Sequence, residues 1–133
     1  MALRYRVTKR SNSIQGKKEQ YILQAVHTGK IDLDTISKAI SNECSLHEVD
    51  VKAVLIALGI KLEYYLEKGN SLDLGAIGKF KMGFKCIAAP EAAQLSPKKN
   101  ITKYHVNYQP SLKLKHKLKS GIATYKEGSR SMG

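Results

Sequence analysis

In this chain of 133 residues, the side chains whose type and spacing best indicate a chemical role belong to lysines at alternate positions. Lys79, Lys81 and Lys85 alternate with apolar side chains, and Lys103 begins a second alternating stretch that ends at Gln109. Alternation with a period of two places such lysines on one face of a β-strand and the apolar side chains on the other. Rows of ammonium groups bind phosphate oxygens, so these four residues are candidate contacts to a polyanion.

The remaining candidate contacts are basic residues in other segments and one proline. They could bind the same polyanion, or they could simply form a well-solvated basic surface. They are Arg4, Arg6, Pro97, Lys98, Lys99, Lys113 and Lys117.

The distribution of charge supports a polyanionic partner. The chain carries a net charge of +12, and this charge is concentrated at its two ends. Residues 1–18 hold six basic residues and no acid, and residues 85–133 hold ten basic residues against two acids. The segment between them carries seven basic and nine acidic residues. A near-neutral folded centre with basic flanks is typical of nucleic-acid binders, because each neutralised phosphate releases a condensed counterion.

The same composition argues against other classes of function. The sequence shows no phosphate loop, no nucleophile paired with a base and no HExxH or Cys/His cluster, so we expect neither an enzyme nor a metal or other cofactor, and no small-molecule substrate. Cys44 and Cys86 are far apart and are expected to be free thiols. No apolar run is long enough to cross a membrane, and no signal peptide is expected at the start.

The first half of the chain predicts a hairpin and two helices. Residues 3–10 alternate and residues 20–27 are rich in strand formers, which predicts an N-terminal β-hairpin with a loop over 11–18. Asp32 is a good N-cap for a helix that ends near residue 42. Ser45 and Glu48 have the spacing of a capping box, which predicts a long helix from there to Lys68. Gly69 is placed to end it in a left-handed conformation.

The second half predicts a β-ribbon followed by a short helix. Two basic-faced strands, at 79–85 and 103–109, are joined by a loop-like stretch over 86–100. The side chains of Phe80, Met82 and Phe84 are expected to lie in the core. The segment 112–119 is ambiguous, because its leucines alternate as in a strand while Leu114 and Leu118 are also one helical turn apart; helix is preferred.

The segment from Gly69 to Phe80 resembles the bacterial histone-like proteins of the HU/IHF family. The resemblance rests on the sequence GNSLDLGAIGKF, in which a glycine-containing turn follows a short apolar strand and leads to a Gly-x-Phe signature. The helix before it and the segment from Pro110 to Leu118 resemble the second and closing helices of that family. Residues 1–10, MALRYRVTKR, are similar to the opening of a longer variant group known mainly from Bacteroidetes.

The resemblance implies an α+β fold in which two chains intertwine. A helical base would carry a three-stranded sheet with a β-ribbon arm, and the N-terminal hairpin would be an extension. The implied division is 1–30 for the β extension, 31–122 for the HU-like domain and 123–133 for a flexible C-terminal tail. In that family a proline at each arm tip wedges between base pairs. Its tip pattern, Arg-Asn-Pro-x-Thr, is missing here, so either Pro97 or Pro90 could be the wedge, or both could only shape a loop.

Two functions follow as expectations. The first is architectural, sequence-independent binding of double-stranded DNA by a homodimer in the bacterial nucleoid, hence in the cytoplasm. The second is an HU-like module that serves as a protein-interaction or scaffold element with weak or no DNA binding. RNA binding is less favoured, because no aromatic motif of the RNP type is present.

Overall fold

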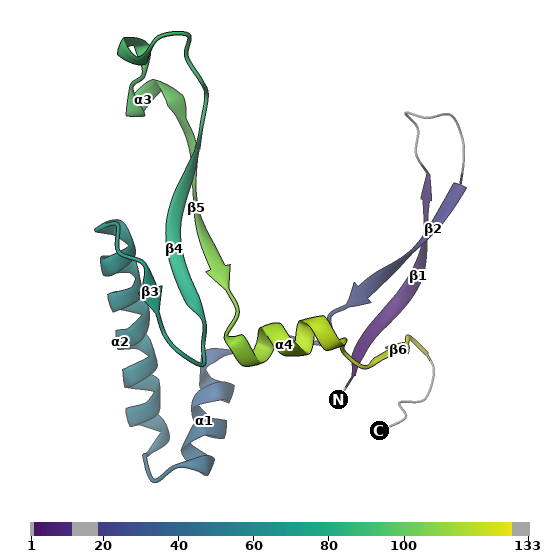
Figure 1. Ribbon diagram of the computed structural model, residues 1–133. Helices are drawn as coiled ribbons and strands as arrows, with labels where there is room; N and C mark the ends of the chain where they lie inside the picture. Colours follow the sequence, from purple (N-terminus) through teal and green to yellow (C-terminus); the bar gives the residue numbers. More distant parts are fainter. Residues whose placement is uncertain (1, 12–18, 129–133) are drawn as a thin grey trace. The chain divides into compact units, whose positions relative to one another are not determined.

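The computed structural model describes residues 2–11 and 19–128 and confirms the α+β class (Figure 1). The elements follow the predicted order of strands and helices, with a short strand added at the end. They are β1 (Leu3–Ser11), β2 (Glu19–Val26), α1 (Leu33–Glu43), α2 (Glu48–Glu67), β3 (Leu72–Asp73), β4 (Lys79–Cys86), η1 (Ala92–Gln94), α3 (Pro97–Asn100), β5 (Ile101–Gln109), α4 (Leu112–Ser120) and β6 (Thr124–Lys126).

The chain forms two compact units. One comprises residues 1–31 together with 117–133, and the other comprises residues 32–116. Helix α4 contributes its first half to the second unit and its last turn to the first. The predicted division into 1–30, 31–122 and 123–133 stays a prediction.

The first unit is a three-stranded sheet in the order β2-β1-β6. Strands β1 and β2 are antiparallel, as the sequence predicted, and β6 runs parallel to β1. The predicted loop over 11–18 lies outside the described residues from residue 12 onward. Strand β6 was not expected, because a flexible tail was predicted from residue 123. The backbone N–H of Leu3 donates to Ala123 O at 2.8 Å, and that of Glu127 donates to Tyr5 O at 2.7 Å.

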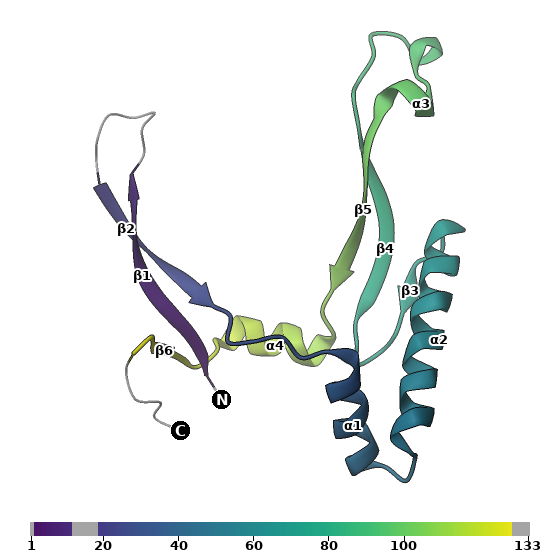
Figure 2. The same ribbon diagram turned by 180° about the vertical axis from the view of Figure 1, so that it is seen from behind.

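The second unit contains a sheet in the order β3-β4-β5, in which β4 and β5 form a long antiparallel ribbon (Figure 2). The ribbon is irregular at one place, between Lys85 and Cys86, where the register shifts. The connection over 87–100 is more ordered than the predicted loop, because it contains η1 and α3. The ambiguous segment after Pro110 is helical in α4, as preferred. The hydroxyl Oγ of Ser111 accepts from the backbone N–H of Leu114 at 3.3 Å, so a side chain supports the start of this helix.

The turn before β4 depends on Gly78. Its φ of +130° lies in a region that L side chains rarely adopt. A Cβ built on Gly78 would lie 2.5 Å from Gln109 O and 2.6 Å from the ring of Tyr108. The hydroxyl of Tyr108 donates to Ile77 O at 2.8 Å, which holds the strand end against the turn. The glycine of the Gly-x-Phe signature is therefore required by close packing as well as by its φ angle.

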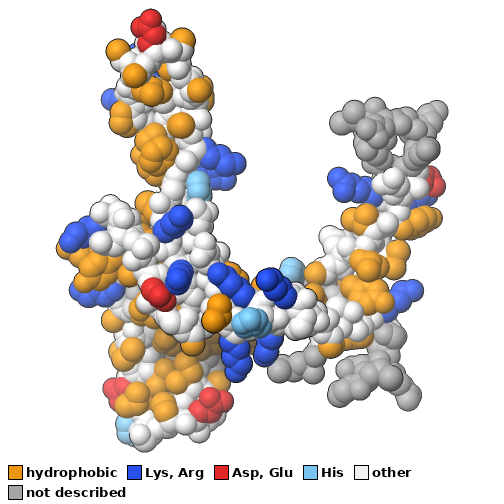
Figure 3. All heavy atoms as spheres, viewed as in Figure 1, with side chains coloured by type: hydrophobic (Ala, Val, Ile, Leu, Met, Phe, Trp, Pro, Cys, Tyr) orange, Lys and Arg blue, Asp and Glu red, His pale blue; other side chains and the backbone are white. Residues whose placement is uncertain are grey.

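The core of a single chain is small. Among the described residues only Val51, Leu66, Ser37 and Gly78 are buried. Apolar side chains are exposed on the surface of the second unit, which contains α1 and α2 (Figure 3). The expectation that Phe80, Met82 and Phe84 lie in the core is wrong for the single chain, since Met82 and Phe84 are 40% and 54% exposed. At the outer end of the ribbon Phe84 shares an apolar cavity with Leu95 and Pro97, yet it stays more than half exposed.

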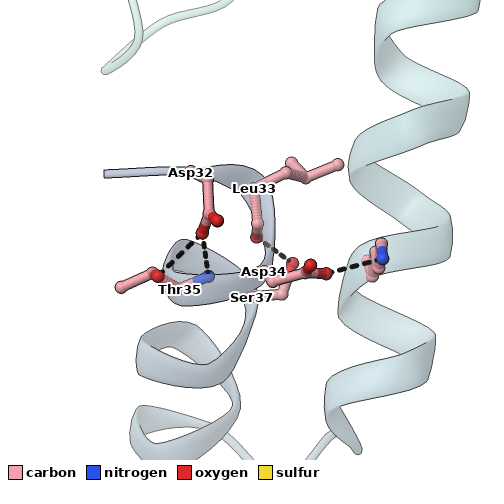
Figure 4. Close-up of polar contacts among 6 residues, drawn as sticks. Asp32, Leu33, Asp34, Thr35 and Ser37 are labelled. Carbon is pink, nitrogen blue, oxygen red and sulfur yellow. Dashed lines mark hydrogen bonds and ion pairs between the residues drawn. The ribbon is translucent and has the colours of Figure 1, made fainter. Parts of the chain in front are cut away.

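Helix α1 begins as predicted, with Asp32 as its N-cap (Figure 4). The carboxylate of Asp32 accepts from the backbone N–H of Thr35 at 2.9 Å and from its hydroxyl at 2.7 Å. The backbone N–H of Thr35 and then its hydroxyl lower the pKa of Asp32. Lys52 of α2 forms an ion pair with Asp34, which raises the pKa of Lys52 and links the two helices.

The predicted capping box of helix α2 is wrong. The helix begins at Glu48, so its N-cap is His47, and no side chain caps it by a hydrogen bond. The hydroxyl of Ser41 donates to Leu46 O at 2.8 Å and so holds Leu46 in the connection between the two helices. Ser45, which precedes Leu46, therefore lies outside the cap position. The other end agrees with the prediction, since Gly69 follows the helix with a φ of +88°.

Candidate nucleic-acid interface

The ribbon has one polar, basic face and one apolar face, and the register of β4 and β5 defines them. Residues directly opposite each other in an antiparallel pair point to the same side of the sheet. The lysines of β4 therefore share a face with alternate residues of β5. The opposite pairs on this face are Lys79 with Gln109, Lys81 with Asn107, Gly83 with His105, and Lys85 with Lys103. We call this set of residues the basic strip.

The register brings together four lysines that the sequence predicted as site residues. Lys85 and Lys103 are directly opposite each other. Like charges in directly opposed positions destabilise a sheet. Neither of these lysines, nor Lys81, has an acidic partner within ion-pair distance among the described residues, and Lys79 has only a long contact of 4.0 Å to Asp73. The strip therefore carries uncompensated positive charge, which an anionic ligand would neutralise.

The centre of the basic strip is closely packed around Gly83. A Cβ at this position would lie 2.9 Å from Nε2 of His105, so the imidazole ring rests on the glycine backbone. The Nδ1 atom of His105 is buried without a hydrogen-bond partner in the part of the chain that the structure describes. His105, Asn107 and Gln109 were not among the predicted contacts. Alternation from Lys103 already places them on the face of that lysine, and the pairing of β4 with β5 shows that the lysines of β4 share this face.

The strip is hollowed near its base. A depression of about 200 Å³ is lined by Lys79, Lys81, Asn107 and Gln109, together with Ser71 and Phe80. A larger cavity of about 510 Å³ lies beside it, between the glycine turn and the start of α4. Its lining includes three lysines, Lys79, Lys113 and Lys115. Lys113, a predicted contact, is thus brought close to Lys79, and Lys115 joins them although it was not predicted.

Other predicted contacts lie outside the strip. Lys98 and Lys99 are exposed in the last turn of α3, at the far end of the ribbon. Pro97 is the first residue of α3 and lines an apolar cavity of about 230 Å³ with Phe84 and Leu95. Lys117 lies in the second half of α4.

Arg4 and Arg6 have partners within their own unit. Nε of Arg4 donates to the hydroxyl of Tyr125 at 3.0 Å, and its guanidinium lies 5.4 Å from the centre of the tyrosine ring. Nε of Arg6 lies 3.2 Å from a carboxylate oxygen of Glu127. Lys9 is likewise paired with Glu19, at 2.9 Å. Arg4, Arg6 and Lys9 therefore bind side chains on, or next to, the neighbouring strands of the sheet.

Across 2–11 and 19–128, no three His, Cys, Asp or Glu side chains gather as they would to hold a metal ion. Both cysteines are free thiols, as predicted. None of the described helices is long and apolar enough to cross a membrane.

A solved structure of another protein has a similar fold. A solved structure from Bacteroides vulgatus ATCC 8482, described as a "putative bacterial DNA binding protein", superimposes with a TM-score of 0.66 at 14% identity. The match covers 98% of this chain and 50% of that one, so the chain spans half the length of its structural relative. No curated protein matches the sequence.

A family model matches almost the whole chain, including the N-terminal sheet and the ribbon. The match extends over residues 1–126, and the family is described as an HU domain fused to wHTH, Ig or a glycine-rich motif. The glycine turn, the helix pair before it and the ribbon with its basic face agree with this assignment. The chain therefore belongs to the HU-HIG family of HU domains.

Proposed function

We propose that this chain binds double-stranded DNA through the basic strip, without reading sequence, as an architectural protein of the bacterial nucleoid in the cytoplasm. Its role is binding rather than catalysis, and it requires no cofactor. We assign it to the longer, Bacteroidetes-type variant group of HU-like proteins, on the strength of the opening residues 1–10.

The observation that carries the proposal is the opposition of Lys85 and Lys103. Two strands that place ammonium groups directly opposite each other lose stability unless an anion lies between or beside them. Neither β4 nor β5 contains an acidic residue that could serve. A phosphate backbone supplies such anions at regular spacing, and two-stranded ribbons fit the grooves of DNA.

The contacts would be to phosphates rather than to bases. Lysine presents a compact charge without the planar fork by which arginine reads guanine, and the strip contains no arginine. Lys79, Lys81, Lys85 and Lys103 form the centre of the proposed interface. Lys98, Lys99 and Lys113 extend it, and Pro97 is the candidate wedge. Lys117, in the last turn of α4, is a further proposed contact. Arg4 and Arg6 contribute less, because they are paired inside the N-terminal sheet.

We further propose that two chains form a homodimer. The described residues of one chain bury too little apolar surface for a stable core, while apolar side chains on α2 and on the ribbon are exposed. The apolar face of the ribbon carries the aromatic pairs Phe80 with Tyr108, tilted at 5.1 Å between ring centres, and Phe84 with Tyr104, edge to face at 6.0 Å. A partner chain that covers α2 and the base of this face would complete the core.

The first test is fluorescence anisotropy of the purified chain with a short random-sequence duplex across a salt series. Tight binding that weakens steeply with salt and changes little with sequence is expected, with a log–log slope of about −0.9 for each phosphate contacted. An RNA duplex of the same sequence and a sedimentation measurement of mass complete the test. Weak binding with a shallow slope at moderate salt would overturn the proposal.

The second candidate function, a protein-interaction element, rests on the tip of the ribbon. The segment from Ile87 to Asn100 carries an apolar cavity lined by Phe84, Leu95 and Ile101, among other residues. Ile87 and Leu95 are more than half exposed. An exposed apolar tip of this kind suits a protein surface. If the anisotropy experiment shows no binding, this tip is where a protein partner should be sought.

A further inference from the structure

Strand β2 is an unprotected edge of the N-terminal sheet. In the order β2-β1-β6 it pairs with β1 along its whole length, from Glu19 to Val26. No strand among the described residues pairs with its other side. Its outward-facing N–H and C=O groups therefore form a template for a further strand.

The charges of this sheet are on the wrong strand to protect that edge. Exposed edges are usually blunted by lysine, by proline or by shortness. Strand β1, in the centre, carries four basic residues, whereas β2 has the sequence EQYILQAV, with a single charge at Glu19. The opposite edge is protected by both shortness and charge, because β6 is three residues long and contains Lys126.

The apolar face of the sheet continues up to this edge and stops there. The register places Leu23 opposite Val7 and Ala25 opposite Tyr5, so these side chains share one face with Tyr21. Tyr21 and Leu23 are 68% and 70% exposed. A strand added beside β2 would extend both the hydrogen bonding and this apolar face.

We propose that the occupant of this edge is β2 of a second copy, paired antiparallel about a two-fold axis. The distribution of charge favours a second copy of this chain as the occupant. Two copies that each carry a net charge of +12 repel each other through their basic surfaces, but β2 contains no basic residue, so two β2 strands can approach without opposed cations. Lys9 and Arg6 on the neighbouring strand are already neutralised by Glu19 and Glu127. Pairing of the strand with itself therefore brings no like charges face to face.

The geometry restricts where the two-fold axis can lie. Directly opposed residues share a face, so the apolar face continues across the junction only if the axis passes through a residue rather than between two residues. Near the middle of the strand the candidates are Ile22, Leu23 and Gln24. With the axis at Leu23, Glu19 lies opposite His27 of the partner subunit, and Tyr21 lies opposite Ala25 of the partner subunit. This contact is additional to the homodimer proposed above and does not depend on DNA binding.

Disulfide trapping tests the inference on the full chain. In a Cys44→Ser/Cys86→Ser background, single cysteines replace Ile22, Leu23 or Gln24, and the protein is oxidised mildly with diamide. The residue on the axis meets its own copy at the Cβ separation of opposed residues, about 4.5–5.5 Å, which a disulfide can bridge. We expect one of the three variants to form covalent dimers at least tenfold faster than the control.

The matched control is Val7→Cys in the same background. Val7 is exposed on the same face, opposite Leu23, but it lies one strand further from the axis. Two copies of it would be separated by about three strand spacings, roughly 14 Å, which exceeds the reach of a disulfide. Circular dichroism and the melting temperature show whether each variant keeps the parent fold.

Equal trapping at Val7 and at the three β2 positions, or no trapping at any of them, would overturn the inference. Pairing of β2 with a different polypeptide would also overturn it. In that case the purified chain would form no cross-link at these positions. Anisotropy on the same variants separates this result from the proposed function. DNA binding without trapping removes only the edge contact, whereas trapping without DNA binding removes only the proposed function.

Discussion

The ribbon and the N-terminal sheet use the same sequence pattern for different purposes. Both contain a strand in which basic residues alternate with apolar ones, β4 in the ribbon and β1 in the sheet. In β1 three of the four basic side chains contact a partner: Arg6 contacts Glu127, Lys9 contacts Glu19, and Arg4 contacts the hydroxyl of Tyr125. In β4 and β5 the lysines lie opposite each other or opposite neutral residues. Alternation of basic residues alone therefore does not identify a binding surface. Whether each cation already has a partner within the protein must also be known.

The largest effect should come from removing unpaired charge from the ribbon. We expect the triple variant Lys81→Gln/Lys85→Gln/Lys103→Gln to bind duplex DNA at least about 100-fold more weakly and to lose about 5 from its salt slope, because three phosphate contacts per chain, and so six per homodimer, disappear. Anisotropy across a salt series measures both quantities.

The matched variant Arg4→Gln/Arg6→Gln/Lys9→Gln removes the same amount of charge from β1. Because those cations are already paired, we expect a loss of less than about fivefold. Equal losses in the two triple variants would show that total charge, rather than the pairing of each cation, determines DNA binding.

Gly78→Ala should damage the ribbon and spare the N-terminal sheet. The added Cβ meets the backbone carbonyl of Gln109 and forces a disfavoured φ, so we expect a loss of about 2 kcal/mol in the free energy of unfolding. Gly75→Ala is the control, because its Cβ meets nothing within 4 Å and only its φ of +60° is disfavoured. Denaturant unfolding measures the free energies.

Hydrogen exchange shows where the damage lies. We expect faster exchange in β4 and β5 of the Gly78→Ala variant and unchanged exchange in β1 and β2. Faster exchange in both regions would contradict the separation of the chain into two compact units.

A smaller effect concerns the ion pair that fastens β6. A double-mutant cycle with Arg6→Gln and Glu127→Gln should give a coupling of about 0.5 kcal/mol at low salt, because both side chains are partly exposed. The coupling should decrease as salt rises. A coupling of zero at low salt would mean that backbone bonds and the contact between Arg4 and Tyr125 hold β6 without this ion pair.

The smallest effect is on helix α1, in the unit that carries the ribbon. The pKa of Asp32 is held below its ordinary value of 3.8 by hydrogen bonds from Thr35. A lowered pKa in the folded state means that this stabilisation is present above the ordinary value and is lost as pH falls through the folded value. Thr35→Val removes the hydroxyl donor and keeps the backbone N–H, so the pKa should rise partway toward 3.8. NMR titration checks this, and an unchanged pKa would assign the shift to the backbone alone.

Local patterns in the sequence were sufficient to predict most of the fold. Strand alternation predicted β1, β4 and β5, and cap residues predicted the start of α1 and the end of α2. The start of α2 was wrong because the hydrogen bond between Ser41 and Leu46 fixes the connection in a way that cap preferences do not reveal. Strand β6 escaped prediction because its three residues have no periodicity of their own and depend on β1, which is far away in sequence.

The candidate site was predictable in part. Lys79, Lys81, Lys85 and Lys103 were found from alternation, but the opposition of Lys85 with Lys103 and the contact of His105 with Gly83 depend on the register. Lys115 was missed because alternation along a helix does not show which lysines point toward a neighbouring turn. The partners of Arg4 and Arg6 could not be foreseen, since Tyr125 lies on a strand that was not predicted and Glu127 directly follows it.

The parallel pairing of β6 with β1 has a mechanical consequence. The hydrogen bonds from Leu3 to Ala123 and from Glu127 to Tyr5 close a loop of chain that contains the entire ribbon unit. A pulling force applied at Leu3 and Glu127 would load these bonds in shear before any tension reached the residues between them. The pairing of β1 with β6 would then have to break before any of the applied force reached the ribbon and its lysines.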